Sequence, residues 1–306
     1  MFPKNYLRKT TFALLAAGSI WALNACGGEK KTNDAATDAD TAAMMEDTTS
    51  SMATTSGSSQ ILSALPKTSE VPAMIHLTGA EFDQTLINAP AKAASYTTTN
   101  DKAALNLGVY ATDIGYLSVY NKTQDVLTYL KGSQKLADHL GLSNAFGSAM
   151  QKRFQENLSS QDSLVRIVDE TMSYVQTYLA ENQRDATGAM VVAGSFIEGL
   201  HISTGLIEKY PKNIPAEIRN GVLTQLILKI IDQKKSLADL IGLMKSVKQD
   251  DQVTAYTQKL TDLQTQFEAL KFEEKVKANV GDFAVTDKTL LGITAKVKEI
   301  RSEMVK

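Results

Sequence analysis

A glutamate and a histidine three residues apart are the residues whose types and spacing best fit the chemistry of a binding or catalytic site. Glu198 and His201 are flanked by Gly194 and Gly205. The offsets of four, three and four place all four residues along one face of a helix. A carboxylate and an imidazole presented in this way could bind a metal ion, bind a small polar ligand, or take part in acid-base chemistry.

The metal hypothesis rests on Glu-x-x-His, the spacing with which helices of di-iron carboxylate proteins hold one metal ion. Those proteins use the motif twice, and neither His76 nor His139 has an acidic residue three positions earlier. A small-ligand pocket and a structural role therefore stay open beside it. In the structural role, the glycines allow a close helix approach, and Glu198 and His201 satisfy each other or a backbone carbonyl.

A third ionisable residue, Asp113, lies in an apolar segment between Val109 and Tyr116. If that face is buried, its carboxylate needs a partner. We expect Asp113 to face His201 or Arg184 across a helix contact.

Two tyrosines complete the candidate ligand pocket, which comprises Asp113, Glu198, His201, Tyr110 and Tyr116. Tyrosines at helical spacing are also common as core residues with the hydroxyl at the rim, so both roles stay open for this pair. An enzyme that uses the three ionisable residues for acid-base catalysis is the weakest hypothesis. The sequence contains no Gly-x-Ser-x-Gly elbow, Walker loop or dinucleotide fingerprint, and we predict no cofactor and no catalytic residue.

These side chains must be positioned by helices, because apolar residues recur at helical spacing from about Asn100, a candidate N-cap, to the last residue. No segment shows convincing strand alternation. The pattern predicts an all-α bundle of about seven to eight helices over 99–306, preceded by an irregular arm over 61–98. The expected helical segments are 102–121, 122–140, 143–158, 161–183, 186–208, about 223–244, about 253–270, and about 293–304 with Thr286 as its cap.

The amino terminus predicts a lipoprotein signal peptide over residues 1–25. A basic leader with Lys4, Arg8 and Lys9 precedes an apolar run from Thr11 to Leu23, which is too short for a membrane span. The run ends in Leu23, Asn24, Ala25 and Cys26, which resembles the lipobox of bacterial lipoproteins. The small residue before the cysteine lets a peptidase cut there, and the thiol accepts the lipid, so Cys26 would become the lipidated first residue.

Residues 26–60 are expected to form the lipidated cysteine and a disordered linker. From Gly27 to Gln60 there is no Val, Ile, Leu, Phe, Tyr or Trp, so the segment cannot bury enough apolar area to offset its backbone entropy. The residue after the cysteine is Gly27, whereas an aspartate at this position would indicate retention in the inner membrane. We therefore expect acyl chains to anchor the protein in the outer membrane. The sequence does not indicate whether the domain faces the periplasm or the cell surface.

Charge and cysteine content narrow the partner classes. The precursor carries a net charge of -2, and removal of residues 1–25 leaves 29 basic and 34 acidic residues, a charge of -5. This balance argues against a nucleic-acid partner. One cysteine excludes an intramolecular disulfide and the paired thiolates of structural zinc sites.

Two blocks of the sequence are similar to uncharacterised helical lipoproteins of Bacteroidota-type Gram-negative bacteria. They are Leu105 to Asp113 (LNLGVYATD) and Ile197 to His201 (IEGLH), and the resemblance covers about residues 65–210. It implies an envelope location and an all-α domain, and it brings no activity. The preferred expectation is a lipid-anchored cell-envelope protein with a non-enzymatic structural or interaction role toward an envelope partner. The alternative is a small-ligand or metal-binding module around Asp113, Glu198 and His201. The sequence does not indicate the oligomeric state.

Overall fold

The computed structural model describes residues 67–271 and 290–306, which are 78% helical and contain no strand. The prediction of an all-α bundle is confirmed, with slightly more helices than the seven to eight expected. The signal peptide, the lipobox with Cys26, the linker and the predicted cap Thr286 lie outside the described residues.

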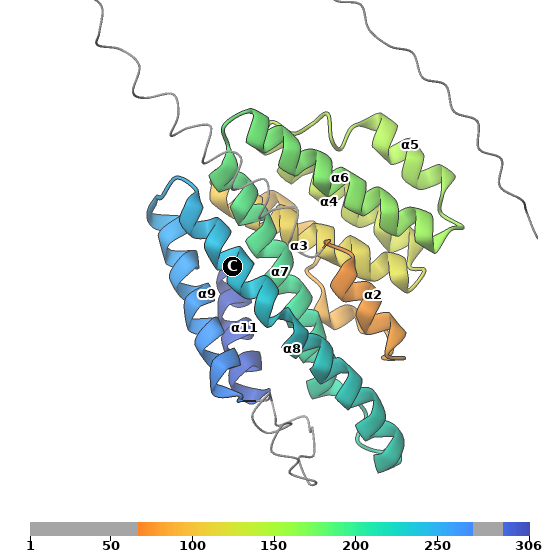
Figure 1. Cartoon of the computed structure of the whole chain (residues 1–306). Helices are drawn as coiled ribbons and strands as arrows, with labels where there is room; N and C mark the ends of the chain where they lie inside the picture. Colours follow the sequence, from red (N-terminus) through yellow and green to blue (C-terminus); the bar gives the residue numbers. More distant parts are fainter. Residues whose placement is uncertain (1–66, 272–289) are drawn as a thin grey trace, which may run out of the picture. The chain divides into compact units, whose positions relative to one another are not determined.

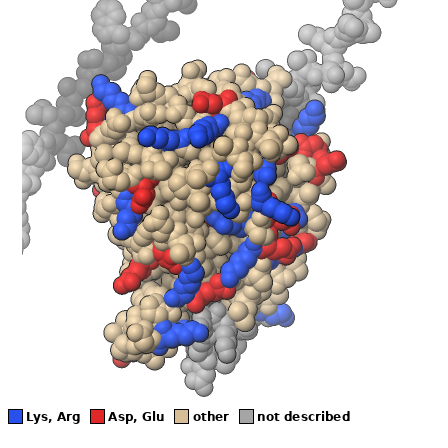
Figure 2. Space-filling view, turned by 180° about the vertical axis from the view of Figure 1, so that it is seen from behind, with Lys and Arg blue, Asp and Glu red and all other residues tan. Residues whose placement is uncertain are grey.

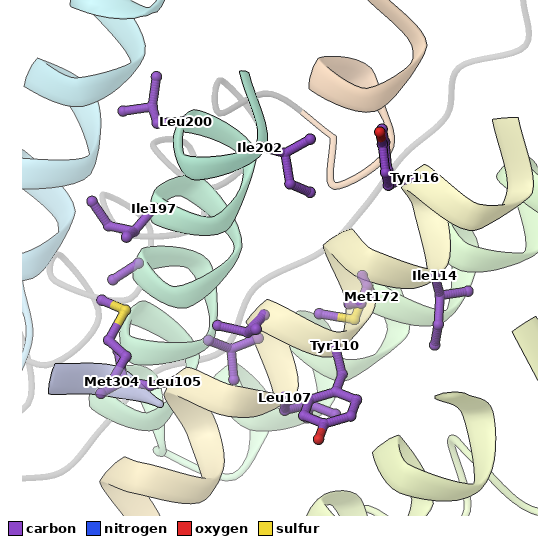
Figure 3. Close-up of a cluster of buried hydrophobic side chains, with 14 of the residues drawn as sticks. Leu105, Leu107, Tyr110, Ile114, Tyr116, Met172, Ile197, Leu200, Ile202 and Met304 are labelled. Atoms are coloured by element: carbon purple, nitrogen blue, oxygen red, sulfur yellow. The ribbon is translucent and has the colours of Figure 1, made fainter. Parts of the chain in front are cut away.

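Two apolar helices, α3 (Asn100–Val119) and α7 (Asp185–Lys209), form the centre of the bundle and pack extensively on each other (Figure 1). Every residue of α3 from Ala103 to Val119 is buried. Figure 3 shows side chains of both helices that belong to one apolar cluster, among them Leu105, Leu107 and Ile114 of α3 and Ile197 and Ile202 of α7. Because both helices are apolar around most of their circumference, neighbours must cover them on several sides.

Glycines set the distance between these two helices. A Cβ added at Gly194 would lie 2.8 Å from the carbonyl carbon of Leu105 and 3.0 Å from its Cα. A Cβ at Gly108 would lie 2.6 Å from the backbone nitrogen of Ser195. At both positions the backbone of the opposite helix occupies the space that a side chain would need.

The long apolar helix α7 has the length and hydropathy of a membrane span, with a mean hydropathy of 1.4 in its most apolar window. Within the bundle, 78% of that window is buried. Packing against other helices therefore accounts for the apolar composition of α7.

The predicted arm forms α2 (Glu70–Leu77) and the 3-10 helices η1 (Gln84–Leu86) and η2 (Pro90–Tyr96). Side-chain hydrogen bonds fasten it to the bundle. Ser69 donates from its backbone nitrogen and its hydroxyl to the carboxylate of Asp169, at 3.2 and 2.6 Å. The arm and the bundle belong to one compact unit.

The next three helices are α4 (Thr123–His139), α5 (Ser148–Glu156) and α6 (Gln161–Glu181). Gly141 follows α4 with a φ of +70°, a backbone conformation that glycine adopts without strain. The expected start at Ser143 is wrong, because α5 begins at Ser148 after a short irregular segment. The expected cap at Asn100 is also displaced by one residue, since the Thr99 hydroxyl accepts from the backbone nitrogen of Lys102 at 3.2 Å.

The carboxy-terminal part consists of α8 (Ala216–Ser246), α9 (Asp251–Ala269) and α11 (Leu291–Met304). Asp250 caps α9 by accepting from the backbone nitrogen of Val253 at 2.8 Å. Helix α11 packs on α7, α9 and α3, so the last helix in the chain touches the centre of the bundle (Figure 1).

Candidate functional site

The polar centre of the bundle is an ion pair between Glu198 of α7 and Arg301 of α11. Arg301 donates from Nε to Oε2 and from Nη2 to Oε1 of Glu198, both at 3.0 Å. The Glu198 side chain is completely buried, and that of Arg301 is 17% exposed. Two parallel hydrogen bonds between a guanidinium and a carboxylate form a strong and geometrically specific contact.

Asp113 of α3 joins this pair as a second buried carboxyl group. Its Oδ2 accepts from the backbone nitrogen of Asn88 at 3.1 Å, while Oδ1 is buried and accepts no hydrogen bond. Burial raises the pKa of Asp113 well above its usual range, and the negative charge of Glu198 raises it further. We predict that Asp113 keeps its proton to a higher pH than an exposed aspartate does and shares this proton with Glu198. In that state the acid, the carboxylate and the guanidinium are together electrically neutral.

The expected partners of Asp113 are corrected by this arrangement. Arg184 donates from Nη1 to the backbone carbonyl of Leu140 at 2.7 Å, and Asp113 has Asn88, Glu198 and Arg301 as its polar neighbours. Arg301 was missed because it lies 103 residues from Glu198 in the chain. The signal that could have found it is an arginine one position after Ile300, on the border of the apolar stripe of the last helix.

His201 lies one helical turn beyond Glu198, and its Nδ1 is buried without a hydrogen-bond partner. Burial lowers the pKa of His201; Glu198 acts against this effect, and the positive charges of Arg301 and Lys298 add to it. The imidazole is therefore neutral at neutral pH. The two oxygens of Glu198 are engaged by Arg301, and within residues 67–271 and 290–306 no group of three or more His, Cys, Asp or Glu side chains could hold a metal ion.

Tyr110 and Tyr116 are fully buried and fasten the arm to α3. The Tyr110 hydroxyl donates to the backbone carbonyl of Ala89 at 2.6 Å. The Tyr116 hydroxyl accepts from the backbone nitrogen of Asp83 at 2.9 Å. Of the two roles considered for these tyrosines, their contacts match that of core residues. Each hydroxyl forms a hydrogen bond with the backbone of the arm.

An open surface hollow lies between α9 and α11, away from the residues of the candidate pocket. Its one lysine, Lys296, is held by carboxylates of Asp262 at 3.4 Å and Glu299 at 3.0 Å. Figure 2 shows that basic and acidic side chains are interleaved on the face of the molecule that it presents. The hollow is lined by Asp262, Thr265, Gln266, Gly292, Ala295, Lys296 and Glu299.

The protonation of Asp113 can be tested with Asp113→Asn. An asparagine keeps a donor toward Glu198 and an acceptor for Asn88, so it should imitate the acid. A raised pKa in the folded state stabilises the fold at pH values below the unfolded pKa of about 3.9, and this contribution is lost as the pH rises toward the folded pKa. We expect the variant and the wild type to have a similar Tm near pH 4, and the variant to become the more stable one as the pH rises to 8.

Thermal unfolding followed by circular dichroism at each pH measures this difference. Asp169→Asn is the matched control, since this carboxylate is held by Ser69 at a partly buried site. If Asp113→Asn lowers the Tm by a constant amount from pH 4 to pH 8, Asp113 is an ionised partner of Arg301 and our assignment is wrong.

Comparison of the chain with protein-family models, with curated proteins and with solved structures finds no match. The site must therefore be interpreted from its own geometry. Asp113 and Glu198 are completely buried and His201 is partly buried. Glu198 binds Arg301 of α11, Asp113 binds the backbone of Asn88, and the two tyrosines bind the arm.

Proposed function

We propose that this chain is a lipid-anchored cell-envelope protein whose helical domain has a non-enzymatic structural or interaction role at the outer membrane. The observation that carries the proposal is the segment Leu23 to Cys26 after a basic and apolar leader. Two or three acyl chains on Cys26 would anchor the protein firmly, whereas one chain alone binds only marginally. A disordered linker up to residue 60 would hold the domain about 30 Å from the bilayer.

A non-enzymatic role is supported by how the reactive side chains are used. Both carboxylate oxygens of Glu198 accept hydrogen bonds from Arg301, and Asp113 accepts a hydrogen bond from the backbone nitrogen of Asn88. Both side chains are completely buried. General acid-base catalysis requires a group within hydrogen-bond reach of a substrate, and these carboxyl groups are instead bonded within the fold.

Cys26→Ser in the full-length precursor tests the anchor. We expect the wild type to incorporate a palmitate analogue and to sediment with outer membranes after a carbonate wash. The variant should incorporate none of the label and leave the membrane fraction, because serine offers no thiol for lipid transfer. Asn24→Ala is the matched control, since it keeps the cysteine and places a common residue in the lipobox.

Two results would contradict the proposal. One is equal labelling of the wild type and Cys26→Ser; the other is a mature protein that does not begin at Cys26 in intact-mass measurements. Protease treatment of intact cells then distinguishes the surface face from the periplasmic face. Crosslinking in cells, with Cys26→Ser as the unanchored reference, tests whether an envelope partner depends on the anchor.

A further inference from the structure

The acceptor for Arg301 is built by parts of the chain other than the helix that carries this arginine. Glu198 lies in the middle of α7, where the neighbouring Gly194 holds α7 against the backbone of α3. Asp113 on α3 lies against Glu198 and is itself fixed by the backbone of Asn88. The carboxylate is therefore positioned by contacts with α3, with the backbone of α7 and with the segment before η2, none of which belongs to α11.

The same region also offers donors to the end of α11. Asn106 of α3 donates to the carbonyl of Met304 at 2.8 Å, and the Tyr96 hydroxyl donates to the carbonyl of Val305 at 3.0 Å. The last carbonyls of a helix have no partner within the helix and carry partial negative charge. Glu198 thus accepts from Arg301, while Asn106 and Tyr96 donate to the carbonyls three and four residues after this arginine. Together they fit the last turn of a helix that carries an arginine in this position.

We propose that α3, α7 and η2 form a preorganised receptor for the carboxy-terminal turn of an arginine-bearing helix, selective for the guanidinium group, which α11 of the same chain occupies. The hydrogen bonds of Nε and Nη2 to separate oxygens of Glu198 are the basis of the selectivity. A lysine ammonium is a point charge and cannot make this side-on pair of hydrogen bonds. The proposal concerns the bundle alone and does not depend on the lipid anchor.

Chemical rescue of the full-length chain with Arg301→Ala tests the receptor. Removal of the side chain leaves room beside Glu198, and methylguanidinium can bring the missing charge and hydrogen bonds to that place. We expect millimolar methylguanidinium to raise the Tm of the variant by about 3 to 6 °C at ten times its dissociation constant. The wild type, whose site is filled, should show a small decrease because guanidinium compounds are denaturants.

Matched controls separate binding from a general salt effect. Methylammonium at the same concentration should not rescue Arg301→Ala. The double variant Arg301→Ala, Glu198→Gln should not respond to methylguanidinium, whereas Arg301→Ala, Asp113→Asn should still respond because asparagine keeps the donor toward Glu198. Arg153→Ala removes an exposed arginine that pairs with Glu170, and it should show no rescue.

Equal responses to methylguanidinium and methylammonium would overturn the proposal, and so would a rescue that survives Glu198→Gln. If Arg301→Ala does not fold alone, Arg301→Lys provides the second test. We expect lysine to leave the fold weakened and methylguanidinium to have no effect while the lysine fills the site. A wild-type Tm in Arg301→Lys would show that the site does not select guanidinium.

Discussion

Arg301→Ala is expected to destabilise the fold by about 3 to 5 kcal/mol, because it leaves the completely buried Glu198 without its counter-ion. For a domain of this size, the corresponding decrease in Tm is about 10 °C. Urea unfolding followed by circular dichroism at pH 7 measures the free energy of unfolding directly. The loss should change little with ionic strength, since buried pairs are weakly screened.

Two further variants test that the charge, and not the lost volume, is responsible. Arg153→Ala removes an arginine whose contact with Glu170 is about half exposed on both sides, and it should change the Tm little. Adding Glu198→Gln to Arg301→Ala removes the stranded charge and should recover part of the stability. A double variant that is less stable than Arg301→Ala would contradict our account of the cluster.

Gly194→Ala should be the second most damaging change, with a loss of about 3 kcal/mol or more in the free energy of unfolding. The new methyl group would fall on the backbone of Leu105, where the carbonyl carbon and Cα lie 2.8 and 3.0 Å from its position. A helix backbone cannot move aside as a flexible side chain does, so α3 and α7 must separate. Equilibrium unfolding in urea measures the effect.

The chain offers matched glycines on another helix. A Cβ at Gly221 or Gly242 of α8 has no neighbouring atom within 4 Å. Alanine favours a helix over glycine by roughly 0.5 to 1 kcal/mol, so Gly221→Ala and Gly242→Ala should raise the stability slightly. If Gly194→Ala behaved like these two variants, the close approach of α3 and α7 would not hold the bundle together.

The periodic segments of the sequence predicted the fold well. Expected segments such as 102–121, 161–183 and 186–208 correspond to α3, α6 and α7, because apolar residues at 3.6-residue spacing record which face is buried. The start of α5 could not be predicted, since Ser143 has the chemistry of a cap but does not begin a helix. The helix propensity of individual residues predicts such a start only weakly, because tertiary contacts can override it.

The candidate site was predictable in its members on α3 and α7 and not in its counter-ion. A buried Asp113 in an apolar helix indicates that a partner exists, but the sequence does not tell which of many distant residues supplies it. His201 and Arg184 were reasonable partners by charge, and Arg301 was passed over because it lies in another helix far along the chain. Contacts between residues about 100 positions apart depend on how helices cross, which periodicity does not record.

The place of α11 in the chain has a consequence for the order of folding. The guanidinium that neutralises Glu198 comes from residue 301, after the other described helices, so a growing chain has α3 and α7 long before it has their counter-ion. Until α11 arrives, Glu198 in the nascent core lacks its counter-ion, and this weakens the packing of α7 on α3. The centre of the bundle therefore gains part of its stability only late in synthesis, and such a delay would suit the export that we propose for this chain.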